Sequence, residues 1–212
     1  MTSLTMKEKE IEFKRNIIIE EASKLINKLG FKNTKMEAIA KKVGFSKASL
    51  YLYFKDKEEI ALSIIGKLLE KFYNNVSNLP SRNISVKEKM EAMKKEHMEF
   101  IKKAKNYIII KTNMNCNDEV HKYVIELKTN LITVLSSILE QGIKEKVFNK
   151  LLDIRRSVLL MEAMLTGVSF LNSIAEGSND KALVDFKVEE MSSFAMDFFY
   201  MGITNTNLEL NK

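Results

Sequence analysis

Residues 34–59 have the sequence TKMEAIAKKVGFSKASLYLYFKDKEE, in which two short segments with apolar residues at helical spacing flank a glycine. Counting from Met36, the small residue Ala40 is fifth, where it lets a second helix cross closely. Gly44 is ninth and can turn the chain at a positive φ without a Cβ penalty. Leu50 is fifteenth and can fill the space between the helices. This spacing is typical of a helix-turn-helix, although helical hairpins that do not bind DNA also show it.

Residues that cap helices mark where this segment and its neighbours begin and end. Thr34 precedes Glu37 by three residues, which is the spacing of a capping box. Asp56 and Glu59 repeat that spacing. Ser46 is placed to cap the helix between them. Together with the apolar periodicity, these caps predict helices over residues 8–29, 35–43, 47–54 and 57–79.

Positive charge is concentrated in the same region. The whole chain has 34 Lys and Arg against 28 Asp and Glu, a net charge of +6. Between Lys24 and Lys57, nine lysines accompany two acidic residues, which gives +7 within 34 residues. Such a block attracts phosphate, either of nucleic acid or of an anionic membrane. The lysines are spread over three short helices instead of one long amphipathic helix, which favours nucleic acid and leaves a peripheral membrane protein as the alternative.

The amino-acid composition limits which other classes of protein the sequence fits. The 212 residues are 45% hydrophobic and 29% charged, with one proline and seven glycines, as expected of a globular, nearly all-helical protein. A single cysteine, Cys116, excludes an internal disulfide framework. The sequence has no apolar run near the roughly 20 residues of a membrane span, and its N-terminus lacks the apolar core of a secretory signal. We therefore expect a cytoplasmic protein.

Catalytic and metal-binding patterns are missing from the sequence. It has two histidines and no glycine-rich phosphate loop, Glu-x-x-His pair or nucleophile elbow, so we expect neither an enzyme nor a bound cofactor. Four potential ligands lie close together, but their spacing matches no zinc pattern, and we interpret them as a polar loop: Cys116, Asp118, Glu119 and His121.

Pro80, the single proline, lies in a polar stretch over residues 77–85 and marks the best boundary in the chain. We expect a DNA-binding domain over residues 1–56, a connecting helix over 57–79 and a larger helical domain over 80–212. Further helices are predicted near residues 86–104, 118–145, 151–175 and 181–201. The predicted fold is all-α with about nine helices.

About a quarter of the chain, from residue 14 to residue 65, resembles the N-terminal domain of the tetracycline-repressor (TetR) family of bacterial transcription regulators. The remainder matches that family in being helical. The matching residues are Ala22-x2-Leu25, Gly30-Phe31, Thr34, Ile39-Ala40, Val43-Gly44-Phe45-Ser46-Lys47, Leu50-Tyr51-x-Tyr53-Phe54 and Lys57-Glu58.

The resemblance implies DNA contacts for particular residues. It gives phosphate contacts to Thr34, Tyr51 and Lys57, and we add Lys35 of the basic block to the DNA-binding set. Positions at or near the bases are Ser46, Lys47, Ala48, Ser49 and Tyr53. Lys47 is the one charged side chain of the recognition helix, and we expect it to contact guanine. Two residues depart from the family's usual pattern: Ala48 replaces a common glycine, and Leu52 a common aromatic or polar residue.

The C-terminal helices are expected to form a homodimer that binds a pseudo-palindromic operator, because one small head buries too little surface for tight specific binding. The predicted dimer stripes are Val184, Val188, Met191, Ala195 and Phe198, with Phe194 and Phe199 beside them, and Leu151, Ile154, Val158, Leu165 and Val168, with Gly167 allowing close approach. The alternative is that each stripe faces the subunit's own core.

A ligand pocket is expected in the same domain. Its predicted lining is Met93, His97, Phe100, Met161 and Met164, and core packing is the alternative role for each. The overall expectation is a repressor that a small, largely apolar molecule releases from DNA.

Overall fold

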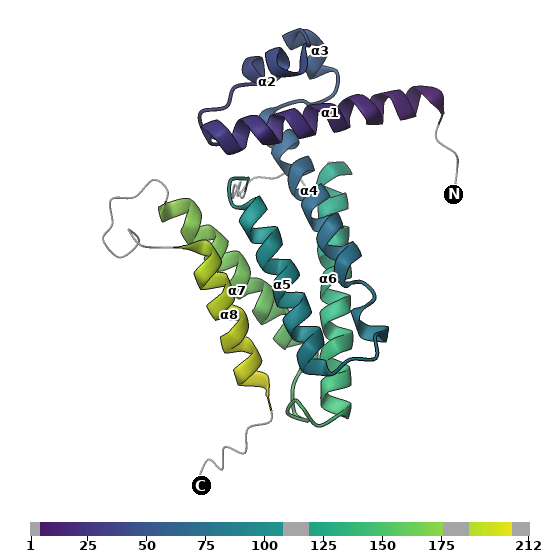
Figure 1. The fold of residues 1–212 in the computed structure, drawn as a ribbon, viewed down its shortest axis with the longest axis vertical. Coiled ribbons are helices and arrows are strands. Elements are labelled where there is room, and N and C mark those ends of the chain that lie inside the picture. The colour runs from purple at the N-terminus through teal and green to yellow at the C-terminus, as the bar shows by residue number, and fades with distance from the viewer. Residues whose placement is uncertain (1–4, 108–118, 176–186, 205–212) are drawn as a thin grey trace.

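The structure is a computed structural model that describes residues 5–107, 119–175 and 187–204. These ranges contain eight α-helices, a short 3-10 helix and an isolated β-bridge between Phe148 and Thr204, so the all-α prediction is confirmed. A small head of three helices lies at one end of a longer helical body, and α4 joins them (Figure 1). The elements are α1 (Met6–Leu29), α2 (Met36–Val43), α3 (Lys47–Tyr51), α4 (Lys57–Val76), η1 (Leu79–Ser81), α5 (Val86–Ala104), α6 (Glu119–Lys144), α7 (Ile154–Ala175) and α8 (Val188–Ile203).

The head has a core of its own. Its buried apolar residues come from every head helix, from the segment after α3 and from the start of α4: Ile18, Ile19, Ala22, Ile26, Met36, Ile39, Ala40, Leu50, Phe54, Ile60 and Ile64. Tyr107, just after α5, is fully buried in this cluster. Its hydroxyl lies 2.8 Å from the Ser23 hydroxyl and donates to the Ser23 carbonyl at 3.1 Å. The end of α5 is therefore anchored to α1.

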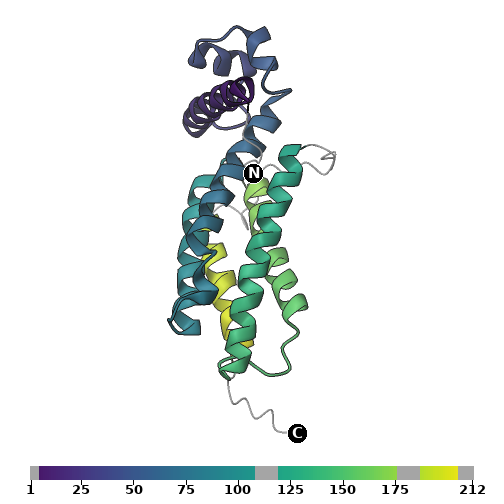
Figure 2. The ribbon, with the colours of Figure 1, turned by 90° about the vertical axis from the view of Figure 1, so that its right-hand side faces the viewer.

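The body packs α4 to α8 around a second core, and the two cores share α4. Ile60 and Ile64 of α4 belong to the head core, whereas Leu69, Phe72 and Val76 belong to the body core. The axis of α4 runs from the head down into the bundle (Figures 1 and 2). One continuous helix thus fixes the position of the head relative to the body.

Several helix ends differ from those predicted. Helix α4 ends at Val76, three residues early, because Pro80 sits in the first turn of the 3-10 helix that follows. Helix α3 ends at Tyr51 instead of residue 54. Helix α7 begins at Ile154, where the Asp153 carboxylate accepts the Arg156 amide at 2.9 Å. The expected start of the last helix at residue 181 lies outside the described residues.

Gly142 is required where the turn after α6 folds back on that helix. A Cβ at this position would lie 2.1 Å from the Cδ2 atom of the Phe148 ring, which is fully buried. Gly202 of α8 is different, because a Cβ there would meet no atom within 4 Å.

We expect Gly142→Ala to lower the free energy of unfolding by about 1–3 kcal/mol, since the Phe148 ring must move. Gly202→Ala, the matched control, should leave stability unchanged or raise it by up to about 1 kcal/mol through helix propensity. Urea unfolding of both variants, followed by circular dichroism, measures the difference. Equal stability of the two variants would contradict the packing role of Gly142.

Candidate nucleic-acid interface and ligand cavity

The helix-turn-helix has the predicted local geometry. Gly44 ends α2 in the left-handed conformation, with φ of 81° and ψ of 23°. The Ser46 hydroxyl caps α3 by accepting the Ser49 amide at 3.0 Å. Ala40 and Leu50 are buried in the head core. The turn therefore places α2 and α3 at a fixed angle, with one side of α3 left uncovered.

Eight of the nine predicted DNA-binding residues lie wholly or partly at the surface of the head. The exposed ones are Lys35, Ser46, Lys47, Ala48 and Tyr51, and the half-buried ones are Ser49, Tyr53 and Lys57. Leu52, directly after α3, is also exposed, with 82% of its surface accessible. An apolar side chain held in water beside a basic surface is suited to contact a thymine methyl group.

Thr34 is the exception. It is buried, and its hydroxyl donates to the Gly30 carbonyl at 2.8 Å. The predicted Thr34–Glu37 capping box is wrong, because α2 begins after Lys35 and has no side-chain cap. The Thr34 hydroxyl closes the turn between α1 and α2 instead, so the side chain expected to contact phosphate does not reach the surface.

Lys47, the expected base contact, forms an ion pair with Glu37 of α2. Its hydrogen bond holds the pKa of the Glu37 carboxyl below the usual value. Both side chains are more than half exposed, so the pair contributes little to stability. The ion pair matters for DNA binding instead, because a DNA base must compete with Glu37 for the Lys47 ammonium.

Lys57 connects the beginning of α4 to the turn between α1 and α2. Its ammonium donates to the Phe31 carbonyl at 2.6 Å and to the Thr34 carbonyl at 2.8 Å. It also lies 4.1 Å from the centroid of the Phe31 ring. Burial lowers the pKa of this lysine. Since an ammonium has three N–H donors, one remains for a phosphate oxygen.

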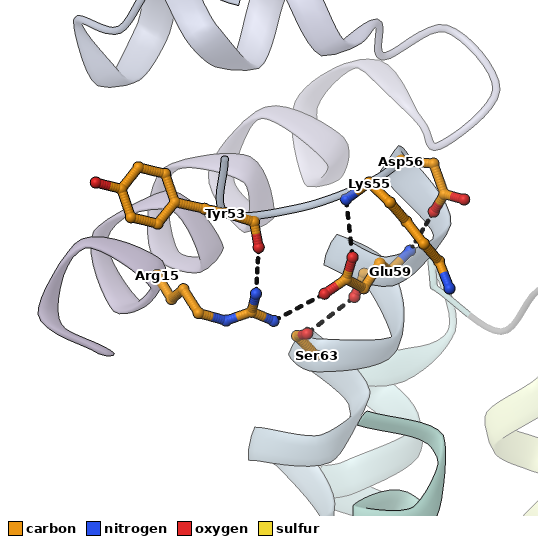
Figure 3. A network of polar contacts seen from close by, with 6 residues as sticks. All are labelled: Arg15, Tyr53, Lys55, Asp56, Glu59 and Ser63. Carbon is orange, nitrogen blue, oxygen red and sulfur yellow. Dashed lines mark hydrogen bonds and ion pairs between the residues drawn. The ribbon is translucent and has the colours of Figure 1, made fainter. Parts of the chain in front are cut away.

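Arg15 holds the segment that follows α3 (Figure 3). Its guanidinium donates to the Tyr53 carbonyl and to the Glu59 carboxylate, the latter at 2.9 Å. The same group lies 4.0 Å from the centroid of the Phe54 ring. Sequence reasoning missed this residue. The signal was available, because Arg15 is the only arginine in the first 81 residues of a lysine-rich chain.

Glu59 is the shared acceptor of this network. Its carboxylate also accepts the Lys55 amide at 2.8 Å, and its own amide donates to the Asp56 carboxylate at 2.7 Å (Figure 3). The Ser63 hydroxyl donates to the Glu59 carbonyl at 2.9 Å. Asp56 therefore caps α4 as predicted. The rest of the predicted capping box is wrong, because the Glu59 carboxylate accepts from Lys55 and Arg15 and not from the Asp56 amide. The network ties the end of α3 to both α1 and α4.

A cavity of about 390 Å³ lies among α4, α5, α6, α7 and α8, which is within the range of small-molecule sites. Its wall is predominantly apolar. Four of the five predicted lining residues contribute to it: Met93, His97, Phe100 and Met161. Met164 does not line it and packs instead against a cluster formed by Ile101, Val168, Val188 and Ala195.

His97 is the most deeply buried polar side chain of this cavity wall. Its ring lies 5.9 Å from that of Phe72 and 6.1 Å from that of Phe100, measured between centroids. The Nε2 atom has no hydrogen-bond partner among the described residues. Burial lowers the pKa of His97 to about 4, so the imidazole is neutral at pH 7.

The outer faces of α7 and α8 are apolar and exposed. Their exposed residues are Leu159, Leu160, Phe170, Leu171, Ile174, Met191, Phe194, Phe198 and Met201. A Cβ on Gly167 of α7 would meet no atom within 4 Å. Some residues of the predicted dimer stripes instead face the subunit's own core: Val158, Val168, Val188, Ala195 and Phe199. Val184 lies outside the described residues. On α7 the exposed apolar face is therefore rotated from the predicted stripe, whereas on α8 it includes Met191, Phe194 and Phe198 of the prediction.

Two further expectations concern a metal site and a membrane span. Cys116 and Asp118 lie outside the described residues. Within the ranges that the structure covers, no three His, Cys, Asp or Glu side chains are grouped to hold a metal ion. In the same ranges, no helix has the length and apolar character needed to cross a bilayer.

The lowered pKa of His97 makes stability depend on pH. The unfolded chain binds this proton near pH 6.5, whereas the folded chain does so near pH 4. The free energy of unfolding should therefore be undiminished above about pH 6.5 and fall by about 3 kcal/mol as the pH drops to 4. Urea unfolding of wild type and His97→Met from pH 7 to pH 4.5 measures this loss, which His97→Met should reduce. Met93→Leu, in the same wall, should keep the wild-type slope; equal slopes for wild type and His97→Met would contradict the assignment.

Comparison with known proteins agrees with this geometry. Residues 18–64 match the profile described as bacterial regulatory proteins of the tetR family. The chain is 26% identical over 153 residues to the fatty acid metabolism regulator protein of Bacillus subtilis, covering 71% of this chain and 77% of that protein. A second relative, the B. subtilis HTH-type transcriptional regulator YhgD, is 26% identical over 133 residues, covering 62% of this chain and 70% of its own.

Solved structures share the fold across most of the chain. The fatty acid degradation regulator FadR from Bacillus halodurans aligns with a TM-score of 0.64 and 19% identity, over 89% of this chain and 95% of its own. FadR from B. subtilis, in complex with stearoyl-CoA, aligns with a TM-score of 0.63 and 19% identity, over 88% of this chain and 98% of its own. The matched profile and the helix-turn-helix geometry show that residues 18–64 are a TetR-family DNA-binding domain, and the chain shares its fold with TetR-family transcriptional regulators.

Proposed function

We propose that this regulator binds a pseudo-palindromic operator as a homodimer and that a molecule with a long apolar chain releases it. The observation that supports this most strongly is that α4 contributes both to the head core and to the cavity wall, where Leu69 and Phe72 lie. A ligand that changes the position of α4 therefore changes the position of the head. The protein acts in the cytoplasm, where its DNA is.

Contacts to bases come from α3 and its flanks. Lys47 binds guanine, and the side chains beside it that meet the bases are Ser46, Ala48, Ser49 and Tyr53. Tyr51, Lys35 and the third N–H of Lys57 bind phosphate oxygens, which fix the register of the head on the duplex. The Arg15–Glu59 network keeps Tyr53 in place.

Dimerisation uses the exposed apolar faces of α7 and α8, which form a four-helix bundle with the same faces of the partner. Gly167 of α7 permits a helix of the partner to approach α7 closely. In this arrangement residues 1–56 are the DNA-binding domain, 57–79 the connecting segment and 80–212 the ligand-binding and dimerisation domain.

The shape of the cavity supports an extended apolar ligand. On α6 its lining runs from His121 to Leu135, which spans about 21 Å at a rise of 1.5 Å per residue. The B. subtilis FadR structure holds stearoyl-CoA, and its fold is shared. An acyl chain therefore fits both the apolar lining and the length of the cavity.

Selection of bound sequences from a random duplex pool tests the DNA-binding part of this proposal. A two-fold symmetric consensus is the expected result, because two heads related by the dimer axis bind two half-sites. Binding to anionic vesicles without enrichment of any duplex would instead favour the membrane alternative.

The Lys47–Glu37 ion pair predicts opposite effects for its two members. Lys47→Ala should weaken operator binding about 5- to 150-fold and relax the preference at one base pair. Glu37→Gln should strengthen operator binding, because it frees the Lys47 ammonium and removes a negative charge beside the phosphates. Titration of each variant with operator and with random DNA measures both effects. Equal losses on the two DNAs for Lys47→Ala would contradict the base contact.

Lys57 should affect folding as well as DNA binding. We expect Lys57→Ala to lower the free energy of unfolding by about 1–2 kcal/mol, since two backbone carbonyls lose their partner. It should also weaken binding to all duplexes and reduce the salt slope by about one per contact. Lys35→Ala is the matched control: it should reduce the salt slope and leave stability within about 0.5 kcal/mol. Unchanged stability of Lys57→Ala would show that its carbonyl bonds are dispensable.

A further inference from the structure

The cavity opens to the surface between α6 and α7. Its exposed lining residues all belong to these two helices: Ile125 and Lys128 of α6, and Thr166 of α7. The lining residues of α4, α5 and α8 are buried or half-buried. A ligand that extends beyond the apolar interior therefore emerges beside α6 and α7, which lie next to each other in the body (Figure 2).

An ion pair lies at this opening. The Lys128 ammonium is 2.6 Å from the Glu162 carboxylate, and both side chains line the cavity. They are 45% and 37% exposed, so neither charge is fully desolvated. Such a pair contributes little to stability and is easily exchanged, because water and ions compete for both partners.

The same face of α6 also has a buried polar atom that lacks a partner among the described residues. His121 precedes Lys128 by seven residues, which places both on one side of the helix, and both line the cavity. The buried Nδ1 atom of His121 has no hydrogen-bond partner among the described residues. A buried polar atom left unpaired is unfavourable, so a ligand that brings a polar group to this side of the cavity gains from it.

We propose that the ligand has an anionic head group, which binds Lys128 in place of Glu162 while the apolar chain occupies the interior. This inference rests on the proposed function, in which the ligand has a long apolar chain. The exchange conserves charge pairing at Lys128, and Glu162, near the surface, returns to water. A neutral ligand with the same chain gains nothing from this exchange, so the opening selects for charge. The anion is either a carboxylate, as in a fatty acid, or a phosphate, as in an acyl thioester of coenzyme A.

Competition binding distinguishes these cases on the full-length protein. A fluorescent polyene fatty acid is bound first and then displaced by palmitate, palmitoyl-CoA or hexadecanol, which share a sixteen-carbon chain. The variants are Lys128→Gln and Glu162→Gln, and Lys144→Gln, an exposed lysine at the far end of α6, is the matched control. Circular dichroism and thermal unfolding establish that each variant is folded. Displacement by hexadecanol, which carries no charge, isolates the contribution of the sixteen-carbon chain to binding.

The expected result is that Lys128→Gln weakens binding of at least one anionic ligand about tenfold or more and changes that of hexadecanol less than about twofold. Glu162→Gln should strengthen binding of the same anion, because Lys128 loses its competitor. If Lys128→Gln binds palmitate more weakly than wild type does, the anion is a carboxylate. If it binds only palmitoyl-CoA more weakly, the anion is a phosphate. If Lys128→Gln affects all three ligands equally or none, the head-group assignment is overturned while the apolar cavity stands. If no ligand displaces the probe from wild type, the proposed function itself fails.

Discussion

Two hydrophobic cores share a single helix in this protein, and the remaining features depend on that constraint. Ile60 and Ile64 fix the upper part of α4 in the head, and Leu69 and Phe72 fix its lower part in the body. A packed core accommodates a helix in few positions, so α4 cannot move at one end independently of the other. The burial of Tyr107 in the head core adds a second connection, from the end of α5.

In the proposed dimer, one position would affect both binding sites, namely that of each head relative to the dimer axis. An operator selects the head spacing that matches its half-sites, and a ligand in the cavity selects the position of α4 that accommodates it. If these positions differ, each ligand weakens binding of the other by the same factor. The head itself needs no rearrangement, because Arg15 and Glu59 hold the segment after α3 against α1 and α4, and Lys57 ties α4 to the turn between α1 and α2.

Sequence patterns predicted those features that depend on neighbours within a few residues. Gly44, Ser46 and Asp56 act as expected because a turn or a cap involves the adjacent backbone. The Thr34–Glu37 box failed because both side chains have better partners elsewhere: Gly30 across the turn, and Lys47 on the next helix. Likewise, helical periodicity indicated four residues of the cavity wall, but whether Met161 or Met164 faces the cavity depends on how α7 packs on α5 and α8. The role of Arg15 needed contacts that span 38 and 44 residues of sequence.

The coupling between the two sites can be measured directly. The dissociation constant for the selected operator is determined without ligand and with the cavity saturated by palmitoyl-CoA, occupancy being verified by displacement of the fluorescent probe. Coupling through α4 predicts that the filled cavity weakens operator binding by about 5- to 150-fold, the usual range for allosteric proteins, and that operator weakens ligand binding by the same factor. An unchanged operator affinity with the cavity full would contradict transmission through α4.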